Sequence, residues 1–355
     1  MPASPPTMSA TESITVNHTL CSVKNSEQQV HSTSSSQPIP KPAPFPTLKP
    51  EAGSILAIVQ ENSPRELYVS PLLWSEKHLE LLQCRFLRRK IPSYEKVTVV
   101  PSKPQSSSAE HELEWLDSRT PLDWAARAAE HIPGCYVEST RTSLVTSILA
   151  VCSYKRADAS SPTFRFDNGH YKTKLATSAL YTLDSVPSLA YLDLSRLKSV
   201  RAAYRFRRRK RMKFLRNVVS DPETPPTDPF IVAVLIALAQ GQQKAETRRT
   251  SGPGSNTPRL QGKGAPPAGQ IEQQPPRILR YVHVLATPHG RTPSLYLYTA
   301  FIPPAFLSKF SQPRKASPHD TITIFSYRLS LGPPYHLPGK VQAVLNAERP
   351  TKKVL

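Results

Sequence analysis

A ten-residue apolar run, Phe230 to Ala239, constrains the fold of this chain more than any other feature. Asp228 and Pro229 precede the run and form a helix start: the carboxylate accepts from free amides of the first turn, and proline at the first position loses no hydrogen bond. A helix that is apolar on every side must be surrounded by protein or lipid. Because the run is far below the roughly 20 residues that span a bilayer, we expect the central buried helix of a domain. Its β-branched residues leave a buried strand as the alternative.

Proline-rich and low-complexity segments indicate where the folded domain begins and ends. The chain has 355 residues, of which 38 are proline, about twice the average usage. Much of that proline lies in stretches that cannot pack a core. We therefore predict a disordered Ser/Pro-rich tail at residues 1–50, a core domain at 51–331 with a disordered insertion at 243–275, and a Pro-rich basic tail at 332–355.

Hydrophobic periodicity and turn residues predict the elements before the central helix. A short strand is expected at residues 53–59. Helices are expected at 72–89, 121–132, 171–183 and 189–219, the last with a basic second half. Residues 142–151 form a helix or a strand, and residues 156–170, which contain the turn pair Asn168-Gly169, form a loop.

After the central helix the pattern changes to strands. The segments 278–287 and 294–302 are rich in β-branched and aromatic residues and flank a turn-like linker, which is a hairpin signal. A short helix at 305–310 and a third strand at 321–331 follow. The predicted fold class is α+β: a central buried helix packed on a small antiparallel sheet, with further helices on the N-terminal side.

Three segments carry a resemblance to other proteins. They are Asp228-Pro229-Phe230-Ile231-Val232, Leu295-Tyr296-Leu297-Tyr298-Thr299-Ala300 and Phe301-Ile302-Pro303-Pro304-Ala305-Phe306-Leu307. Over about residues 228–330 the chain resembles a group of uncharacterised proteins from filamentous fungi. The resemblance implies a compact C-terminal core in an intracellular fungal protein, and it implies no activity or binding residue.

The sequence offers little catalytic or metal-binding chemistry. A helix followed by a hairpin is similar to the core of restriction-type nucleases, but those enzymes need acidic metal ligands on the two strands, and the segments 278–287 and 294–302 contain none. The four cysteines form no CxxC pair, and the histidines match no ligand spacing. We predict no catalytic residue, no metal site, no cofactor and no small-molecule ligand. A degenerate nuclease-like protein or an unfamiliar enzyme is the alternative.

The chain has a net charge of +20, and in one stretch the basic residues are denser than elsewhere. Residues 196–216 contain eleven basic side chains, no acidic one and three interleaved aromatic rings. Solvated helix faces usually mix the two signs, whereas a basic run is typical of a nucleic-acid patch or a nuclear import signal. The predicted polyanion contacts are Arg205, Arg207, Arg208, Arg209, Lys210, Arg211, Lys213 and Arg216.

These observations favour a non-enzymatic intracellular protein that binds nucleic acid or another polyanion through the basic helix 196–216. The expected partners are nucleic acid, an acidic protein surface and a nuclear import receptor, and no membrane. The N-terminal residues lack the pattern of a signal peptide, so we expect the nucleus or the cytoplasm, neither secretion nor a transmembrane protein. The alternative is a protein-interaction or scaffold module with no nucleic-acid role.

Overall fold

The computed structural model describes residues 49–62, 67, 69–94, 120–159, 161–208, 227–250, 281–288, 293–317 and 321–347. The predicted disorder at residues 1–48 and 251–275 therefore lies outside the described residues. The described part has an α+β fold, as the sequence predicted at the level of class.

A seven-stranded mixed sheet organises the fold, with strand order β1-β9-β8-β7-β6-β5-β2. The β7–β8, β8–β9, β5–β6 and β2–β5 pairs are antiparallel, whereas β1–β9 and β6–β7 are parallel. A separate two-stranded hairpin joins β3 and β4. The strands are β1 (Cys84–Arg89), β2 (Lys155–Arg156), β3 (Thr163–Phe166), β4 (Tyr171–Lys174), β5 (Ala179–Leu183), β6 (Val186–Asp193), β7 (Tyr281–Thr287), β8 (Ser294–Phe301) and β9 (Ile322–Ser330).

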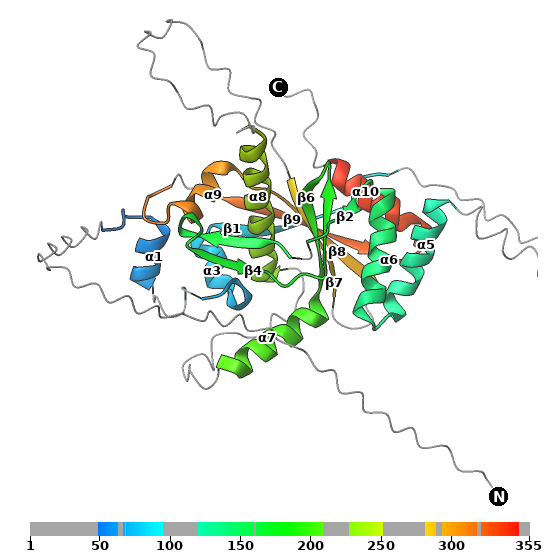
Figure 1. Ribbon diagram of the computed structural model, residues 1–355. Coiled ribbons are helices and arrows are strands. Elements are labelled where there is room, and N and C mark those ends of the chain that lie inside the picture. The colour runs from blue at the N-terminus through cyan, green and yellow to red at the C-terminus, as the bar shows by residue number, and fades with distance from the viewer. Residues whose placement is uncertain are drawn as a thin grey trace, which may run out of the picture. The chain divides into compact units, whose positions relative to one another are not determined.

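Helices cover both faces of the large sheet (Figure 1), and each face has its own hydrophobic core. Successive strand residues point to opposite faces: Val282 and Val284 of β7 belong to one core and Leu285 to the other. The first core lies under α3 (Glu76–Leu81), α8 (Pro229–Thr250) and α9 (Pro304–Ser311), the second under α5 (Pro121–His131), α6 (Glu138–Val151) and α10 (Leu337–Ala347). The other helices are α1 (Ile55–Asn62), α7 (Leu194–Arg208) and the short 3₁₀ turns η1 (Pro71–Leu73), η2 (Ile132–Gly134), η3 (Asp167–Gly169) and η6 (Pro334–His336).

The central helix is confirmed as α8. All ten residues of the apolar run are buried against the sheet and the neighbouring helices. Asp228 starts the helix as expected: its Oδ1 accepts from the Phe230 N–H at 2.9 Å, and its carbonyl accepts from the Ile231 N–H at 3.0 Å. The helix begins at Pro229 and continues to Thr250, so residues 243–250, which the sequence assigned to the disordered insertion, are helical. None of the described helices is both long and apolar enough to cross a membrane.

The C-terminal predictions hold for the hairpin, the short helix and the third strand, which are β7–β8, α9 and β9. The prediction of a small antiparallel sheet was wrong, because two parallel pairs and seven strands make the sheet large and mixed. The predicted tail after residue 331 was also wrong in its first part. Val341, Val344 and Leu345 of α10 are buried in the second core, so the packed region extends to at least residue 345.

Few of the predictions for the N-terminal half hold. Thr120 caps α5 through the Asp123 N–H, as the Thr-Pro start implied, and residues 142–151 are part of helix α6. The predicted strand at 53–59 is helix α1. The predicted helix at 72–89 divides into η1, α3 and strand β1, the helix at 171–183 is strands β4 and β5, and the long helix at 189–219 begins as strand β6. The predicted loop at 156–170 contains β3. In β1 and β6, pairing with a strand distant in sequence overrides a local pattern that fitted a helix, whereas β3–β4 and β5–β6 are local hairpins.

Candidate polyanion-binding surface

The β3–β4 hairpin has one basic and one aromatic face. Arg165 lies directly opposite Lys172 in the ladder, and Phe166 lies opposite Tyr171. Directly opposite residues share a face, and neighbours along a strand alternate. The two cations therefore project from the same side of the hairpin, away from the aromatic side. Like charges in this position destabilise a hairpin, so the ladder itself does not favour this pair.

Gln240 of α8 fastens this hairpin to the central helix. Its Oε1 accepts from the backbone N–H of Arg165, and its Nε2 donates to the carbonyl of Arg165, both at 2.9 Å. The side-chain amide thus makes the two hydrogen bonds that a neighbouring strand would make. Because Gln240 is one helical turn before Lys244, the contact places Arg165 beside the exposed C-terminal half of α8.

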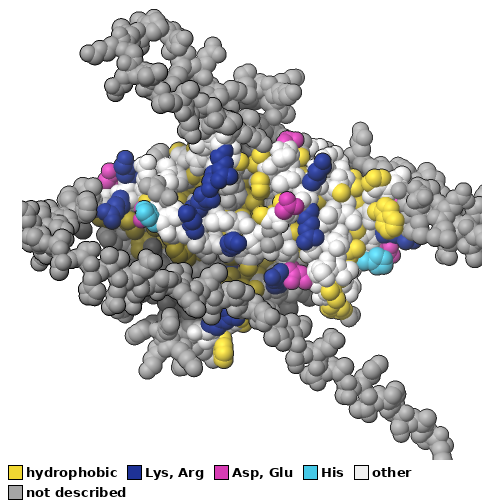
Figure 2. All heavy atoms as spheres, viewed as in Figure 1, with side chains coloured by type: hydrophobic (Ala, Val, Ile, Leu, Met, Phe, Trp, Pro, Cys, Tyr) yellow, Lys and Arg dark blue, Asp and Glu magenta, His cyan; other side chains and the backbone are white. Residues whose placement is uncertain are grey.

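Four cations gather at this contact: Arg165 of β3, Lys172 of β4, and Lys244 and Arg248 of α8. Lys244 and Arg248 are exposed and stand four residues apart on one helix face, a spacing at which like charges repel. Arg165 and Arg248, with a smaller effect of Lys172, lower the pKa of Lys244 below its usual value. We name these four residues the basic cluster. Figure 2 shows lysine and arginine side chains gathered on the face that carries β4 and α8 in Figure 1.

A shallow hollow of about 250 Å³ lies beside Arg165 and Lys244 of the basic cluster. Arg165 and Lys244 line it together with polar side chains of α8, and α9 closes its far side. The polar lining residues are Gln240, Gln243, Thr247 and Ser311. Guanidinium, ammonium, amide and hydroxyl groups are hydrogen-bond donors that phosphate and carboxylate oxygens accept. The surface can therefore hold an anion between two secondary-structure elements.

The contacts predicted from the sequence lie at the end of α7 and beyond it. Arg205 is half-buried and Arg207 is exposed. Arg208 ends the helix, and nothing is described of its side chain. Arg209, Lys210, Arg211, Lys213 and Arg216 lie outside the described residues. The structure therefore places Arg205 and Arg207 on one helix and leaves the prediction for the others as it was.

Two earlier members of the basic run form ion pairs with acidic side chains. Arg201 is 4% exposed and donates to both carboxylate oxygens of Asp228, at 2.6 and 2.7 Å, and to the carbonyl of Leu72 at 3.0 Å. Arg196 pairs with Glu138 of α6 at the surface. Arg201 was not among the predicted contacts, and its charge is neutralised inside the fold.

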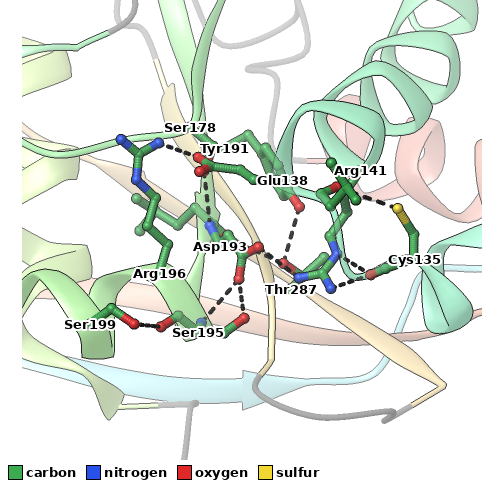
Figure 3. Close-up of polar contacts among 12 residues, drawn as sticks. Cys135, Glu138, Arg141, Ser178, Tyr191, Asp193, Ser195, Arg196, Ser199 and Thr287 are labelled. Carbon is green, nitrogen blue, oxygen red and sulfur yellow. Dashed lines mark hydrogen bonds and ion pairs between the residues drawn. The ribbon is translucent and has the colours of Figure 1, made fainter. Parts of the chain in front are cut away.

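A buried polar cluster at the carboxyl ends of β6 and β7 stabilises a helix start, as the Arg201–Asp228 pair does (Figure 3). Asp193 ends β6, and its Oδ1 accepts from the backbone N–H of Ser195 in the first turn of α7 at 3.0 Å. Arg141 of α6 donates to the other carboxylate oxygen at 2.7 Å and also to the carbonyl of Cys135. The carboxylate thus caps α7 and is neutralised by a neighbouring helix.

The same arrangement occurs twice along the chain. Arg141 of α6 holds the Asp193 cap of α7, and Arg201 of α7 holds the Asp228 cap of α8. Buried charges are stable only when they are paired and hydrogen-bonded, and both aspartates meet that condition. Since each carboxylate is committed to a helix start and an arginine, this cluster stabilises the fold and offers no free base. The part of the chain that the structure describes contains no group of three His, Cys, Asp or Glu side chains able to hold a metal ion.

Comparison with known proteins adds no assignment. No family model matches the chain, and neither the curated proteins nor the solved structures give a significant match.

Sequence reasoning missed the basic cluster, although one signal was present. Arg165 and Lys172 flank the Asn168-Gly169 turn, and the residues before it alternate between aromatic and basic side chains. That alternation is typical of a hairpin with two unlike faces. The contribution of Lys244 and Arg248 has no local signal, because it depends on how α8 packs against the hairpin.

Proposed function

We propose that this protein is a non-enzymatic nucleic-acid-binding protein whose contacts are to the phosphate backbone. The observation that carries the proposal is the basic cluster. The fold brings four cations from three elements together against their mutual repulsion, and two of them, Arg165 and Lys244, line a hollow together with uncharged hydrogen-bond donors. A bound chain of phosphates removes that repulsion and releases counterions.

The exposed end of α7 supplies a second set of cations. Arg207 is exposed, and the basic sequence continues to Arg216. α7 leaves the sheet at the side opposite the C-terminal end of α8 (Figure 1), so the two sets of cations form separate surfaces. Neither set has the register of a groove-reading motif, and we expect little base specificity. The same basic stretch is our candidate for an import signal, which would direct the protein from the cytoplasm to the nucleus.

A salt series with a cluster variant, a charge-matched control and a helix variant tests the proposal. The cluster variant replaces Arg165, Lys172, Lys244 and Arg248 with glutamine. The control replaces four exposed cations outside both basic surfaces, Arg88, Lys90, Arg127 and Lys155, and so changes the net charge equally. The helix variant replaces Arg207, Arg208, Arg209, Lys210 and Arg211 with alanine. Binding to labelled single-stranded and duplex DNA is measured by fluorescence anisotropy between about 50 and 300 mM salt, because the logarithm of the affinity falls linearly with the logarithm of the salt concentration.

The cluster variant is expected to bind more weakly, with a salt slope that is flatter by about 0.9 per lost duplex contact and about 0.7 per lost single-strand contact. The control should keep the slope of the unaltered protein. Equal slopes for the cluster variant and the control would refute the assignment of the cluster. Competition with unlabelled DNA and with poly-glutamate at equal charge distinguishes nucleic acid from an acidic protein partner. If nucleic acid is the ligand, unlabelled DNA displaces the labelled DNA better than poly-glutamate does. Imaging of the tagged helix variant tests the import signal, which predicts a shift to the cytoplasm.

A further inference from the structure

The hairpin that carries the basic cluster has a cavity on its other side. A partly open space of about 310 Å³ lies between α1, the residues on either side of η1, α3, the β3–β4 hairpin and α9. This is within the range of pockets that hold small organic molecules. The described residues that line it are aliphatic and aromatic except for Ser70 and His78, and none of them is charged.

Aromatic rings form rigid walls for this cavity. Phe164 meets Trp74 edge to face at 5.5 Å between ring centroids, and it meets Phe310 in the same way at 5.5 Å. Phe166 and Tyr171, the cross-strand pair of the hairpin, also line the space. Edge-to-face packing of this kind fixes ring orientations. The cavity is therefore shaped by side chains that are held in place by each other, as expected for a preformed site.

His78 of α3 brings a buried polar group into this apolar space. Its side chain stacks on Trp74 at 5.7 Å between centroids, and the residue is 6% exposed. The backbone N–H of Ser75 donates to Nδ1 at 3.0 Å, so Nδ1 accepts and the proton of the neutral ring is on Nε2. Burial lowers the pKa of His78 to about 4, with opposing effects from the backbone of Leu67 and Ser75, so the ring is neutral at pH 7.

The Nε2–H of His78 makes no hydrogen bond of ordinary geometry among the described residues, although the backbone of Leu67, which also lines the cavity, interacts with the ring and raises its pKa. A buried donor without a partner costs about 1–3 kcal/mol, and such groups are rare in folded proteins. The same imidazole is oriented by Ser75 and by the Trp74 ring, so the donor direction is fixed. A group that supplies the missing acceptor from within the cavity would remove the cost.

The geometry points to a small-molecule site in this cavity: it binds a compact, neutral, mainly aromatic molecule whose carbonyl or ether oxygen accepts a hydrogen bond from His78 Nε2. The apolar lining excludes charged ligands, because no described lining residue offers a counter-charge and an unpaired charge is costly to bury. The limited volume favours a single small molecule over a peptide. The basic cluster lies on the other face of the hairpin, and the two hollows share only Phe310 among their described lining residues.

Binding of a fluorescent naphthyl ketone tests the site. Prodan is neutral and aromatic, carries one carbonyl, and shifts its emission to the blue in apolar surroundings. The unaltered full-length protein should bind one equivalent saturably. Val59→Trp fills the cavity from α1 and should abolish the shift, whereas Val137→Trp makes the same change at an exposed residue outside the cavity and should leave it unchanged.

His78→Phe keeps an aromatic ring against Trp74 but removes the donor. It should weaken prodan binding about two- to tenfold, the effect of one hydrogen bond, and should leave the affinity for the analogue with an alkyl chain in place of the ketone unchanged. On the unaltered protein, methyl NMR signals of Ile55, Ile58 and Leu81 should shift when prodan is added. Non-saturable binding, or methyl signals that do not move, would overturn the site. An equal loss for both ligands in His78→Phe would overturn the role of Nε2.

Discussion

Substitution of Arg201 by methionine tests whether the first half of the basic run is structural. Arg201 is inside the protein, with side chains of 5% and 7% relative exposure at the pair it forms with Asp228. The change removes three hydrogen bonds and leaves the Asp228 carboxylate buried without its counter-charge. Removing one partner of a buried pair costs about 3–5 kcal/mol. That is a large part of the 5–15 kcal/mol that typically stabilises a domain.

The matched control is Arg196→Met, in the same helix and also in an ion pair. Its pair with Glu138 is exposed, at 48% and 35%, and exposed pairs contribute about 0–1 kcal/mol. Urea unfolding followed by circular dichroism and tryptophan fluorescence gives the unfolding free energy of both variants. A loss below about 1 kcal/mol for Arg201→Met, as for a surface pair, would refute the reasoning.

A double substitution separates charge from packing. Asp228→Asn keeps an oxygen that can cap α8 but leaves Arg201 as an unpaired buried charge, so it should cost as much as Arg201→Met. The combined variant has neither charge and keeps the cap. It should therefore be more stable than either single variant, with a favourable coupling free energy in the double-mutant cycle. Additive losses would show that the two residues act independently and that the pair does not hold the start of α8.

Two further predictions concern the core. Leu235→Asp places a charge at a fully buried position of α8 and should lower the unfolding free energy by several kcal/mol, by order of magnitude. The control Leu87→Asp, at a 48% exposed position of β1, should change the unfolding free energy by about 0.5 kcal/mol or less. Equal melting temperatures for Leu235→Asp and the unaltered protein would contradict the packing of α8. Burial raises the pKa of Tyr181, Tyr191 and Tyr298 above the usual value of 10, so the folded state retains protons that the unfolded state releases. The contribution of these tyrosines to the unfolding free energy is therefore fully present below about pH 10. Above that pH the unfolding free energy falls by up to about 1.4 kcal/mol per pH unit for each tyrosine. Urea unfolding at pH 9–12, with Tyr191→Phe reducing the slope, measures this effect, and a pH-independent unfolding free energy would contradict it.

The sequence alone predicted the elements that are marked by cap or turn residues and by a hydrophobic pattern in the same short segment. The Asp228-Pro229 cap and the apolar run specify α8, Thr120-Pro121 specifies α5, and alternating residues on both sides of a turn specify the β7–β8 hairpin. In these elements the hydrogen bonds and the hydrophobic pattern lie within a short stretch of chain, so nearby residues carry the information.

Only the tertiary structure decided the elements that depend on distant partners. Cys84–Arg89 is a strand because β9 supplies hydrogen bonds from more than 200 residues away, and Val186–Asp193 is a strand because it lies between β5 and β7. The tertiary structure also decided which charged side chains are neutralised and which lie close together. The sequence shows an unbroken basic run, but Arg201 is neutralised by Asp228, while Arg165 and Lys244 meet through the Gln240 contact. Coulomb energy depends on distance and burial, which the linear order of residues does not contain.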